Sequence, residues 1–198
     1  FQAIRPSTAP IGGKDMAEPI RFVVHGAAGR MGREVLAGLC REPDLKPVGG
    51  VDKKPGGESI ALPDGSGTIP YSSSLDDILR RTRPQVVVDF SVADACIAGA
   101  SVVASHGVNL VIGTTGLTEA NLKELDALAT LHNVGIFVAP NFALGAVLLS
   151  HLARVAAPFF QYVDIVEMHH ETKIDAPSGT ALSIARAIAS AGKGFKRN

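Results

Sequence analysis

The 198-residue sequence has few cysteines, no excess of charge of either sign and no long apolar run. Lys and Arg together number 19, as do Asp and Glu, so the formal net charge is +0. A chain with balanced charge offers no basic field that would attract nucleic acid or an anionic membrane. We therefore expect neither as a partner and favour a small-molecule substrate.

The two cysteines, Cys40 and Cys96, have neither CxxC spacing nor a disulfide framework around them. We interpret both as thiols of the core. No apolar run approaches the length of a membrane span, and the first residues lack the basic-then-apolar pattern of a secretory signal. These features favour a reducing compartment, which we take to be the cytoplasm.

Residues 1–18 contain many Pro, Gly, Ser and Thr and have no helical or strand periodicity, which predicts a flexible tail. The tail is either an expression leader ahead of a natural start at Met16 or a genuine extension, and we favour the leader. The segment GGESIALPDGSGTIP, residues 56–70, is similarly rich in turn residues and predicts a surface loop.

From residue 19 to residue 141, short Val- and Ile-rich runs alternate with segments of helical periodicity. The runs are IRFVVHG, KPVGGVD, QVVVDFS, NLVIGTT and GIFVAPN, and the helices are predicted over 30–41, 75–81, 93–105 and 118–131. The runs are continuously apolar, which is typical of parallel strands covered by helices on both faces. We therefore predict a Rossmann-like, doubly wound α/β domain over residues 19–141.

The pattern changes after Asn141. Residues 143–157 predict a helix rich in small residues, YVDIVEMHH (162–170) predicts a strand, and a further helix is expected from about Ser178. Residues 142–198 are thus expected to form a second domain of the α+β class.

The first predicted strand leads into GAAGRMG, which places Gly26, Gly29 and Gly32 at the start of a helix. Glycines at this spacing permit a tight turn and a close approach to a pyrophosphate, while the helix N-terminus supplies N–H groups. Asp52 ends the next strand twenty positions after Gly32, where an acid that binds the adenosine ribose belongs. Together these features predict a dinucleotide site.

Cations near this site bear on which dinucleotide it takes. Arg30, Lys53 and Lys54 could bind a 2′-phosphate, so NADPH and NADH both remain open. Three further motifs, DFS (89–91), GTTG (113–116) and APNF (139–142), stand at the carboxyl ends of predicted strands. Each alone could be an ordinary turn, but ligands of such sheets bind at these strand ends, and three in a row favour cofactor contacts.

The segment HHETKIDAPSGT, residues 169–180, combines two histidines and a lysine with a turn that opens a helix capped by Ser178. Neighbouring strand residues point to opposite faces, so His169 and His170 should have different roles unless the strand ends or bulges there. A substrate carboxylate at the helix N-terminus would lie beside Lys173 and a histidine, both able to exchange protons. A solvated strand end before an ordinary capped helix is the plain alternative, and a metal site would lack a third ligand.

These motifs, above all HHETKIDAPSGTA, closely resemble the 4-hydroxy-tetrahydrodipicolinate reductase (dihydrodipicolinate reductase) family from about Ile20 to the last residue. The resemblance implies an enzyme of diaminopimelate and lysine synthesis in which NADPH or NADH donates hydride to a cyclic unsaturated dicarboxylate. It implies that His169 is the acid/base and Lys173 the proton donor. The substrate contacts then fall on His170, Ser178, Gly179 and Thr180. The cofactor contacts fall on Gly26, Ala27, Ala28, Gly29, Arg30, Met31, Asp52, Lys53, Gly113, Thr114, Thr115, Ala139, Pro140, Asn141 and Phe142.

The resemblance also makes residues 19–141 the dinucleotide-binding domain and residues 142–198 a partial substrate-binding and tetramerisation domain. Members of the family continue past Asn198 with strands that complete the substrate cavity, so a homotetramer is expected only for the full-length chain. A plant member would lie in the plastid stroma. Two alternatives stay open: another nicotinamide-dependent oxidoreductase, such as an amino-acid or semialdehyde dehydrogenase, and a non-catalytic dinucleotide sensor.

Overall fold

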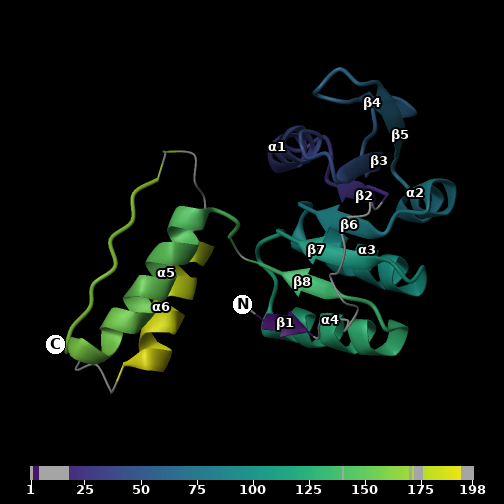
Figure 1. Ribbon diagram of the computed structural model, residues 1–198. Helices are drawn as coiled ribbons and strands as arrows, with labels where there is room; N and C mark the ends of the chain where they lie inside the picture. The colour runs from purple at the N-terminus through teal and green to yellow at the C-terminus, as the bar shows by residue number, and fades with distance from the viewer. Residues whose placement is uncertain (1, 5–17, 140, 170, 172–175, 193–198) are drawn as a thin grey trace. The chain divides into compact units, whose positions relative to one another are not determined.

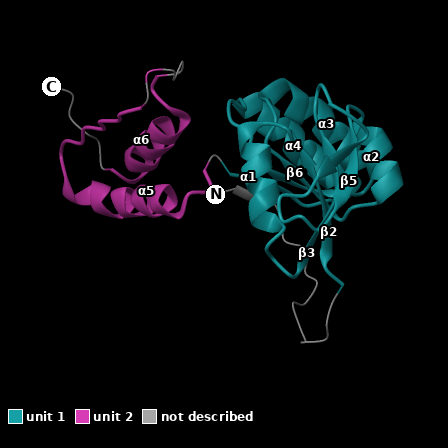
Figure 2. Cartoon of the chain, turned by 90° about the horizontal axis from the view of Figure 1, so that it is seen from above, with its two compact units in different colours: residues 1–139 teal, residues 140–198 magenta. Residues whose placement is uncertain are grey.

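The computed structural model describes residues 2–4, 18–139, 141–169, 171 and 176–192. The chain divides into two compact units, residues 1–139 and residues 140–198 (Figure 2). Within the described residues, the first unit carries the sheet and the second carries helices joined by irregular segments.

An eight-stranded sheet in the order β1-β8-β7-β6-β2-β3-β5-β4 forms the first unit (Figure 1). The strands are β1 (Gln2–Ile4), β2 (Ile20–His25), β3 (Leu45–Val51), β4 (Ser59–Ala61), β5 (Thr68–Ser72), β6 (Val86–Asp89), β7 (Asn109–Ile112) and β8 (Ile136–Val138). The strands from β8 to β5 are parallel, and β1 and β4 join the two edges antiparallel. The chain order reverses between β2 and β6, and this switch point is where such sheets bind their ligands.

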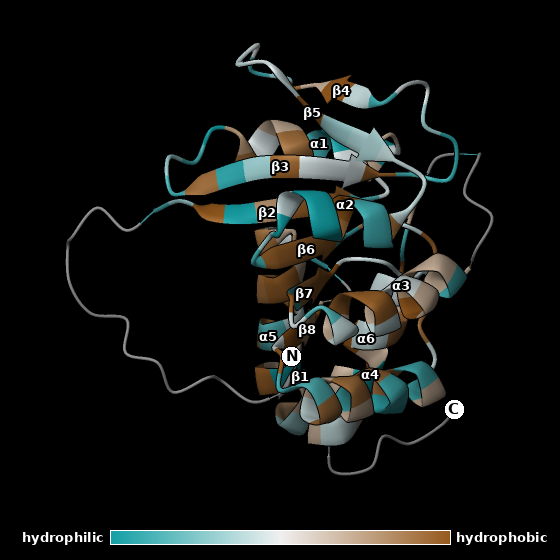
Figure 3. Cartoon of the chain, turned by 90° about the vertical axis from the view of Figure 1, so that its right-hand side faces the viewer, coloured by the Kyte–Doolittle hydropathy of each residue, from teal (hydrophilic) through white to brown (hydrophobic). Residues whose placement is uncertain are grey.

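Helices cover both faces of the sheet, which confirms the doubly wound architecture. They are α1 (Arg30–Leu39), α2 (Leu75–Thr82), α3 (Ala93–Ser105) and α4 (Glu119–His132). Val23 of β2 packs in one cluster with residues of α2, α3 and α4, whereas Phe22 and Val24 pack with Leu36 of α1. Figure 3 shows α2, α3 and α4 in front of the strands and α1 behind them.

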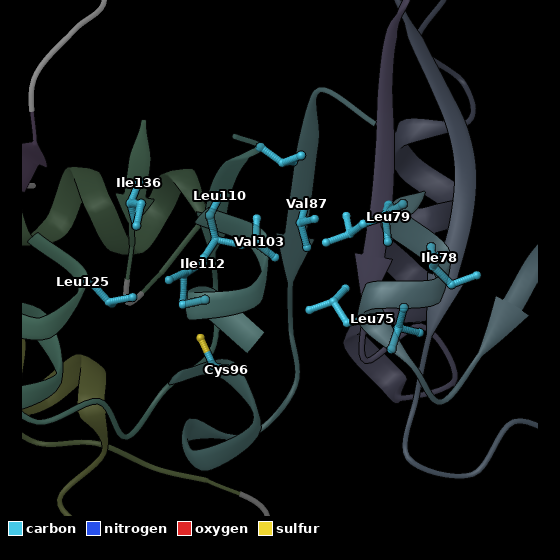
Figure 4. Packing of buried hydrophobic residues seen from close by; sticks show 14 of the residues in the cluster. Leu75, Ile78, Leu79, Val87, Cys96, Val103, Leu110, Ile112, Leu125 and Ile136 are labelled. Carbon is cyan, nitrogen blue, oxygen red and sulfur yellow. The ribbon is translucent and has the colours of Figure 1, made fainter. Parts of the chain in front are cut away.

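The helix predicted over 118–131 begins at Glu119, because Thr118 is its N-cap and forms a capping box with Asn121. Leu125 and Ala129 are buried, and Leu122 and Leu128 pack against the same cluster, as their shared face predicted. Figure 4 shows Leu125 beside Ile136 and Ile112 in this core.

Leu125→Ala is expected to lower the free energy of unfolding by about 2–5 kcal/mol, because the fully buried side chain would leave a cavity. Leu131→Ala, on the same helix, is the matched control: its side chain is 76% exposed, so the change should stay within about 0.5 kcal/mol. Urea unfolding of both variants measures the difference. Equal losses would contradict the assignment of Leu125 to the core.

Two segments differ from the prediction. The loop predicted over 56–70 contains β4 and most of β5, whose Ile69 and Tyr71 are buried. Their alternation is too short to stand out among the turn residues around it. The predicted tail over 1–18 is wrong for Gln2–Ile4, which pair with β8 through backbone hydrogen bonds that need no apolar pattern; residues 5–17 lie outside the described residues.

The second unit contains α5 (Leu144–Ala156), the 3-10 helix η1 (Ala157–Phe159) and α6 (Gly179–Ala191), and α5 packs against α6. Both predicted helices are thus present. The strand predicted over 162–170 does not form in residues 162–169, because the described part of this unit supplies no strand to pair with it. No helix of the described residues is long and apolar enough to cross a membrane.

Candidate active site

The glycine turn between β2 and α1 has the geometry that a close backbone approach requires. Gly26 has φ +83°, and a Cβ added to it would lie 2.7 Å from the carbonyl oxygen of Phe90. A Cβ on Gly32 would lie 2.0 Å from the carbonyl oxygen of Gly26. Gly29 is the N-cap of α1 and places no side chain over the first turn. Glycine at these positions therefore lets the turn, the start of α1 and the segment after β6 pack closely, and a larger side chain would push them apart.

Asp52 joins the end of β3 to this turn. Its Oδ2 accepts a hydrogen bond from the N–H of Ala28 at 3.0 Å, and its Oδ1 accepts one from the N–H of Lys53 at 2.7 Å. The carboxylate is half-buried, and the neighbouring Arg30 and Lys53 are exposed. The structure thus brings together the predicted ribose acid, the glycine turn and a cation suited to a phosphate.

A buried polar cluster lies at the ends of β2, β6 and β7. Asp89 is 1% exposed, and its Oδ2 lies 2.6 Å from Nδ1 of His25. Its Oδ1 accepts hydrogen bonds from the N–H and the hydroxyl of Ser91, at 3.0 and 2.8 Å, and from the hydroxyl of Thr114 at 2.6 Å. The Thr114 hydroxyl is therefore committed to the protein, whereas Thr115 is exposed. Sequence reasoning missed His25.

This cluster holds Asp89 in its ionised form. Burial alone would raise its pKa, but the hydrogen bond and charge of His25, with the hydrogen bonds of Thr114 and Ser91, keep it below the ordinary value of 3.8. Cys96 of α3 is fully buried nearby, and burial together with the charge of Asp89 raises its pKa, so it stays a thiol. Cys40 is half-buried.

Because the pKa of Asp89 is depressed in the folded state, its ionisation contributes stability at pH above its unfolded value, and this contribution is lost as the pH falls through the folded value. Asp89→Asn cannot titrate, so its free energy of unfolding should change less than that of the wild type between about pH 6 and pH 3. Urea unfolding at a series of pH values measures both curves. Parallel curves would contradict the ionised pair.

The APNF motif spans the change from the first unit to the second. Ala139 is buried, and its N–H donates to the carbonyl oxygen of Ile112. Asn141 accepts a hydrogen bond from the N–H of Ala143 at 2.8 Å and donates one to the hydroxyl of Thr180 at 3.2 Å. A residue predicted to contact cofactor is thus hydrogen-bonded to one predicted to contact substrate. Phe142 is half-exposed, and Pro140 lies outside the described residues.

In the second unit, Ser178 caps α6 as predicted: its hydroxyl oxygen accepts from the N–H of Ala181 at 3.0 Å. Ser178 also donates to Glu167, from its N–H to Oε1 at 2.7 Å and from its hydroxyl to Oε2 at 2.5 Å. Nδ1 of His169 lies 3.8 Å from the same Oε2. The anion at this helix N-terminus is therefore Glu167, which sequence reasoning missed; an acid two residues before the paired histidines was the available signal.

The remaining predicted residues of this stretch are only partly described. Gly179 and Thr180 form the first turn of α6, where backbone N–H groups point out of the helix. His170 and Lys173 lie outside the described residues. In the described ranges there is no group of three or more His, Cys, Asp or Glu side chains that could hold a metal ion.

Comparisons with known proteins match both units. The family model described as "Dihydrodipicolinate reductase, N-terminus" matches residues 20–142, and the one described as "Dihydrodipicolinate reductase, C-terminus" matches residues 145–198. The 4-hydroxy-tetrahydrodipicolinate reductase of Dehalococcoides mccartyi is 49% identical over 180 residues, which are 90% of this chain and 68% of that protein. That of Moorella thermoacetica is 46% identical over 88% of this chain and 66% of its own length.

Solved structures agree with these relatives. The dipicolinate-bound dihydrodipicolinate reductase from Paenisporosarcina sp. TG-14 has a TM-score of 0.76 and 33% identity, over 91% of this chain and 69% of that one. The WlbA dehydrogenase from Bordetella pertussis, in complex with NADH and UDP-GlcNAcA, has a TM-score of 0.58 at 20% identity over 73% of this chain and 44% of that one, a likeness of fold alone. This chain spans about two thirds of the length of the reductases it matches.

Proposed function

This chain belongs to the dihydrodipicolinate reductase family, and we propose that it reduces 4-hydroxy-tetrahydrodipicolinate to tetrahydrodipicolinate with NADPH or NADH, in diaminopimelate and lysine biosynthesis. The observation that carries the proposal is the match of both family halves, in order, along nearly the whole described chain. The chain is then an oxidoreductase whose substrate is a small dicarboxylate.

The first unit holds the cofactor. The pyrophosphate lies at the glycine turn, where the N-terminus of α1 supplies N–H donors, and the close backbone packing that Gly26 and Gly32 permit holds α1 in place. Asp52 accepts from the adenosine ribose, and Lys53 is available to a 2′-phosphate. The nicotinamide supplies the hydride when it is bound. Gly113, Thr114 and Thr115 complete the contacts at this sheet edge, and Ala139, Pro140, Asn141 and Phe142 are the remaining proposed cofactor contacts.

The second unit binds the substrate and manages the proton. A dianionic substrate needs fixed N–H donors, which the first turn of α6 provides at Gly179 and Thr180, and His170 is a further proposed substrate contact. Glu167 lies between Ser178 and His169, so it orients the histidine and ties it to this turn. Hydride addition creates electron density that must be protonated in place, and Lys173 and His169 carry that proton.

Assembly and compartment follow from the same assignment. The full-length protein forms a homotetramer through its second unit, and it works in the cytoplasm, where the free thiols of Cys40 and Cys96 persist.

The test is a kinetic assay of the full-length protein with freshly generated cyclic substrate, following the absorbance of the reduced nicotinamide. Oxidation of the cofactor that depends on this substrate is the expected result. Saturable cofactor binding without turnover would instead favour a dinucleotide sensor. Turnover with amino-acid or semialdehyde substrates alone would favour another oxidoreductase. Either result would overturn the proposed reaction.

A further inference from the structure

We propose that His25 is a positioning residue for cofactor binding, which it supports through Asp89 by holding the tips of β6 and β7 in place. The inference rests on the proposed cofactor function and deepens it. His25 belongs to none of the cofactor motifs, but it is the last residue of β2 and directly precedes the glycine turn. Its strand pairs with β6 at the switch point of the sheet.

A network of side-chain hydrogen bonds that starts at His25 connects the ends of three neighbouring strands, β2, β6 and β7. Asp89 accepts from other groups throughout the cluster, so Nδ1 of His25 carries the proton and donates to Oδ2 at 2.6 Å. The other oxygen of Asp89 accepts from Ser91 and from Thr114. One buried carboxylate therefore connects the end of β2 to the residues that follow β6 and β7.

The histidine ring has little freedom to move. Its side chain is 12% exposed and lies over Gly99 of α3, where an added Cβ would be 3.4 Å from Nδ1 and 3.3 Å from Cε1. The other titratable group at this place is Cys96 of α3, which is fully buried and neutral. The His25 ring therefore pairs with Asp89, and it is held between this carboxylate and α3.

Backbone hydrogen bonds hold the strands together independently of this pair. The N–H of Phe90 donates to the carbonyl oxygen of His25 at 3.0 Å, and the N–H of Gly113 donates to that of Asp89 at 2.8 Å. Loss of the His25 side chain should therefore leave the register of the sheet intact. What it releases is the side-chain network that fixes the conformation of the tips.

The residue after Asp89 lies between two cofactor motifs. A Cβ added to Gly26 would lie 2.7 Å from the carbonyl oxygen of Phe90. A Cβ added to Gly113 would lie 2.3 Å from the aromatic ring of Phe90. A small shift of the Asp89–Ser91 tip would therefore displace both the glycine turn and the GTTG tip. Such a shift should therefore change the affinity for the cofactor more directly than any other measurable property.

The experiment measures the Kd of NADH and NADPH by fluorescence titration, together with kcat at saturating cofactor and the Tm. His25→Ala should raise the Kd of the preferred cofactor roughly tenfold, because the side chains released at the tips must be ordered again on binding, while kcat changes by about twofold or less. His25→Asn keeps an N–H donor near the place of Nδ1 and should restore most of the affinity. Thr114→Val removes the hydroxyl at the other end of the network and should also raise the Kd.

His106→Ala is the matched control. His106 also pairs with an aspartate, Nε2 to Oδ1 of Asp76 at 2.8 Å, but this pair joins the end of α3 to the start of α2 and lies outside the cluster. Its removal should leave the Kd unchanged. If His25 acts through Asp89 on Thr114, the double variant His25→Ala/Thr114→Val should lose less affinity than the two single losses combined.

The outcomes separate this inference from the proposed function. If the wild-type protein binds neither dinucleotide, the cofactor assignment itself fails. If the wild type binds but His25→Ala and Thr114→Val bind equally well, with only the Tm lowered, His25 is a structural residue and the positioning role is wrong. A loss in His25→Asn as large as in His25→Ala would also overturn it, as would fully additive losses in the double variant.

Discussion

His169→Ala and Lys173→Ala are each expected to lower kcat by roughly 10²–10⁴-fold, because each removes a group that exchanges a proton in the proposed reduction. The Kd of the cofactor should change little, since the residues proposed to bind the dinucleotide belong mainly to the first unit. Steady-state kinetics with the cyclic substrate and a separate cofactor titration measure the two quantities. If the two residues act as one unit, the double variant should be hardly slower than the worse single variant.

His151→Ala is the control for this pair. His151 is an exposed histidine of α5 in the same unit, and it has no place in the proposed machinery, so its removal should leave kcat unchanged. Glu167→Gln supplies an intermediate case: it keeps one acceptor oxygen for Ser178, but a donor NH2 group replaces the other and the charge beside His169 is lost, so kcat should fall less than in His169→Ala. Turnover at the wild-type rate in both His169→Ala and Lys173→Ala would contradict the assigned proton transfer.

The parallel sheet could be predicted because its strands are buried on both faces and are therefore continuously apolar, as in the three valines of β6. Helix α4 was equally clear, because Leu122, Leu125 and Leu128, which pack on the core, recur on one face of the helix. The edge strands β1 and β4 left no such pattern. They are three residues long, and an edge is held mainly by backbone hydrogen bonds.

In the candidate site, too, some residues could be predicted from the sequence and others could not. The glycine turn and Asp52 were predictable because their spacing reflects local geometry, a turn and the strand that follows it. The pair of His25 and Asp89 was not, because 64 positions separate them and they meet only through the parallel register of β2 and β6. The contact between Asn141 and Thr180 depends likewise on tertiary packing. Local motifs were thus visible in the sequence, while the polar contacts that orient them required the fold.

Gly32→Ala is expected to disrupt the dinucleotide site more than alanine at any other glycine of the described residues. Its Cβ would lie 2.0 Å from the carbonyl oxygen and 2.8 Å from the carbonyl carbon of Gly26, so α1 would have to move away from β2. Backbone on both sides resists this movement, and the free energy of unfolding should fall by about 3 kcal/mol or more. Cofactor affinity should fall beyond measurement, because the glycine turn and the N-terminus of α1 shift together.

Gly38→Ala tests whether this loss comes from the close approach or from the helix itself. Gly38 lies in the same helix, and a Cβ added to it would meet no atom within 4 Å. Alanine there should raise the free energy of unfolding by about 0.5–1 kcal/mol, since it lowers the entropy of the unfolded chain. Urea unfolding and a cofactor titration of the two variants separate the causes. A stable Gly32→Ala protein with wild-type cofactor affinity would mean that α1 can move without cost, and the pyrophosphate could then not be held by this turn.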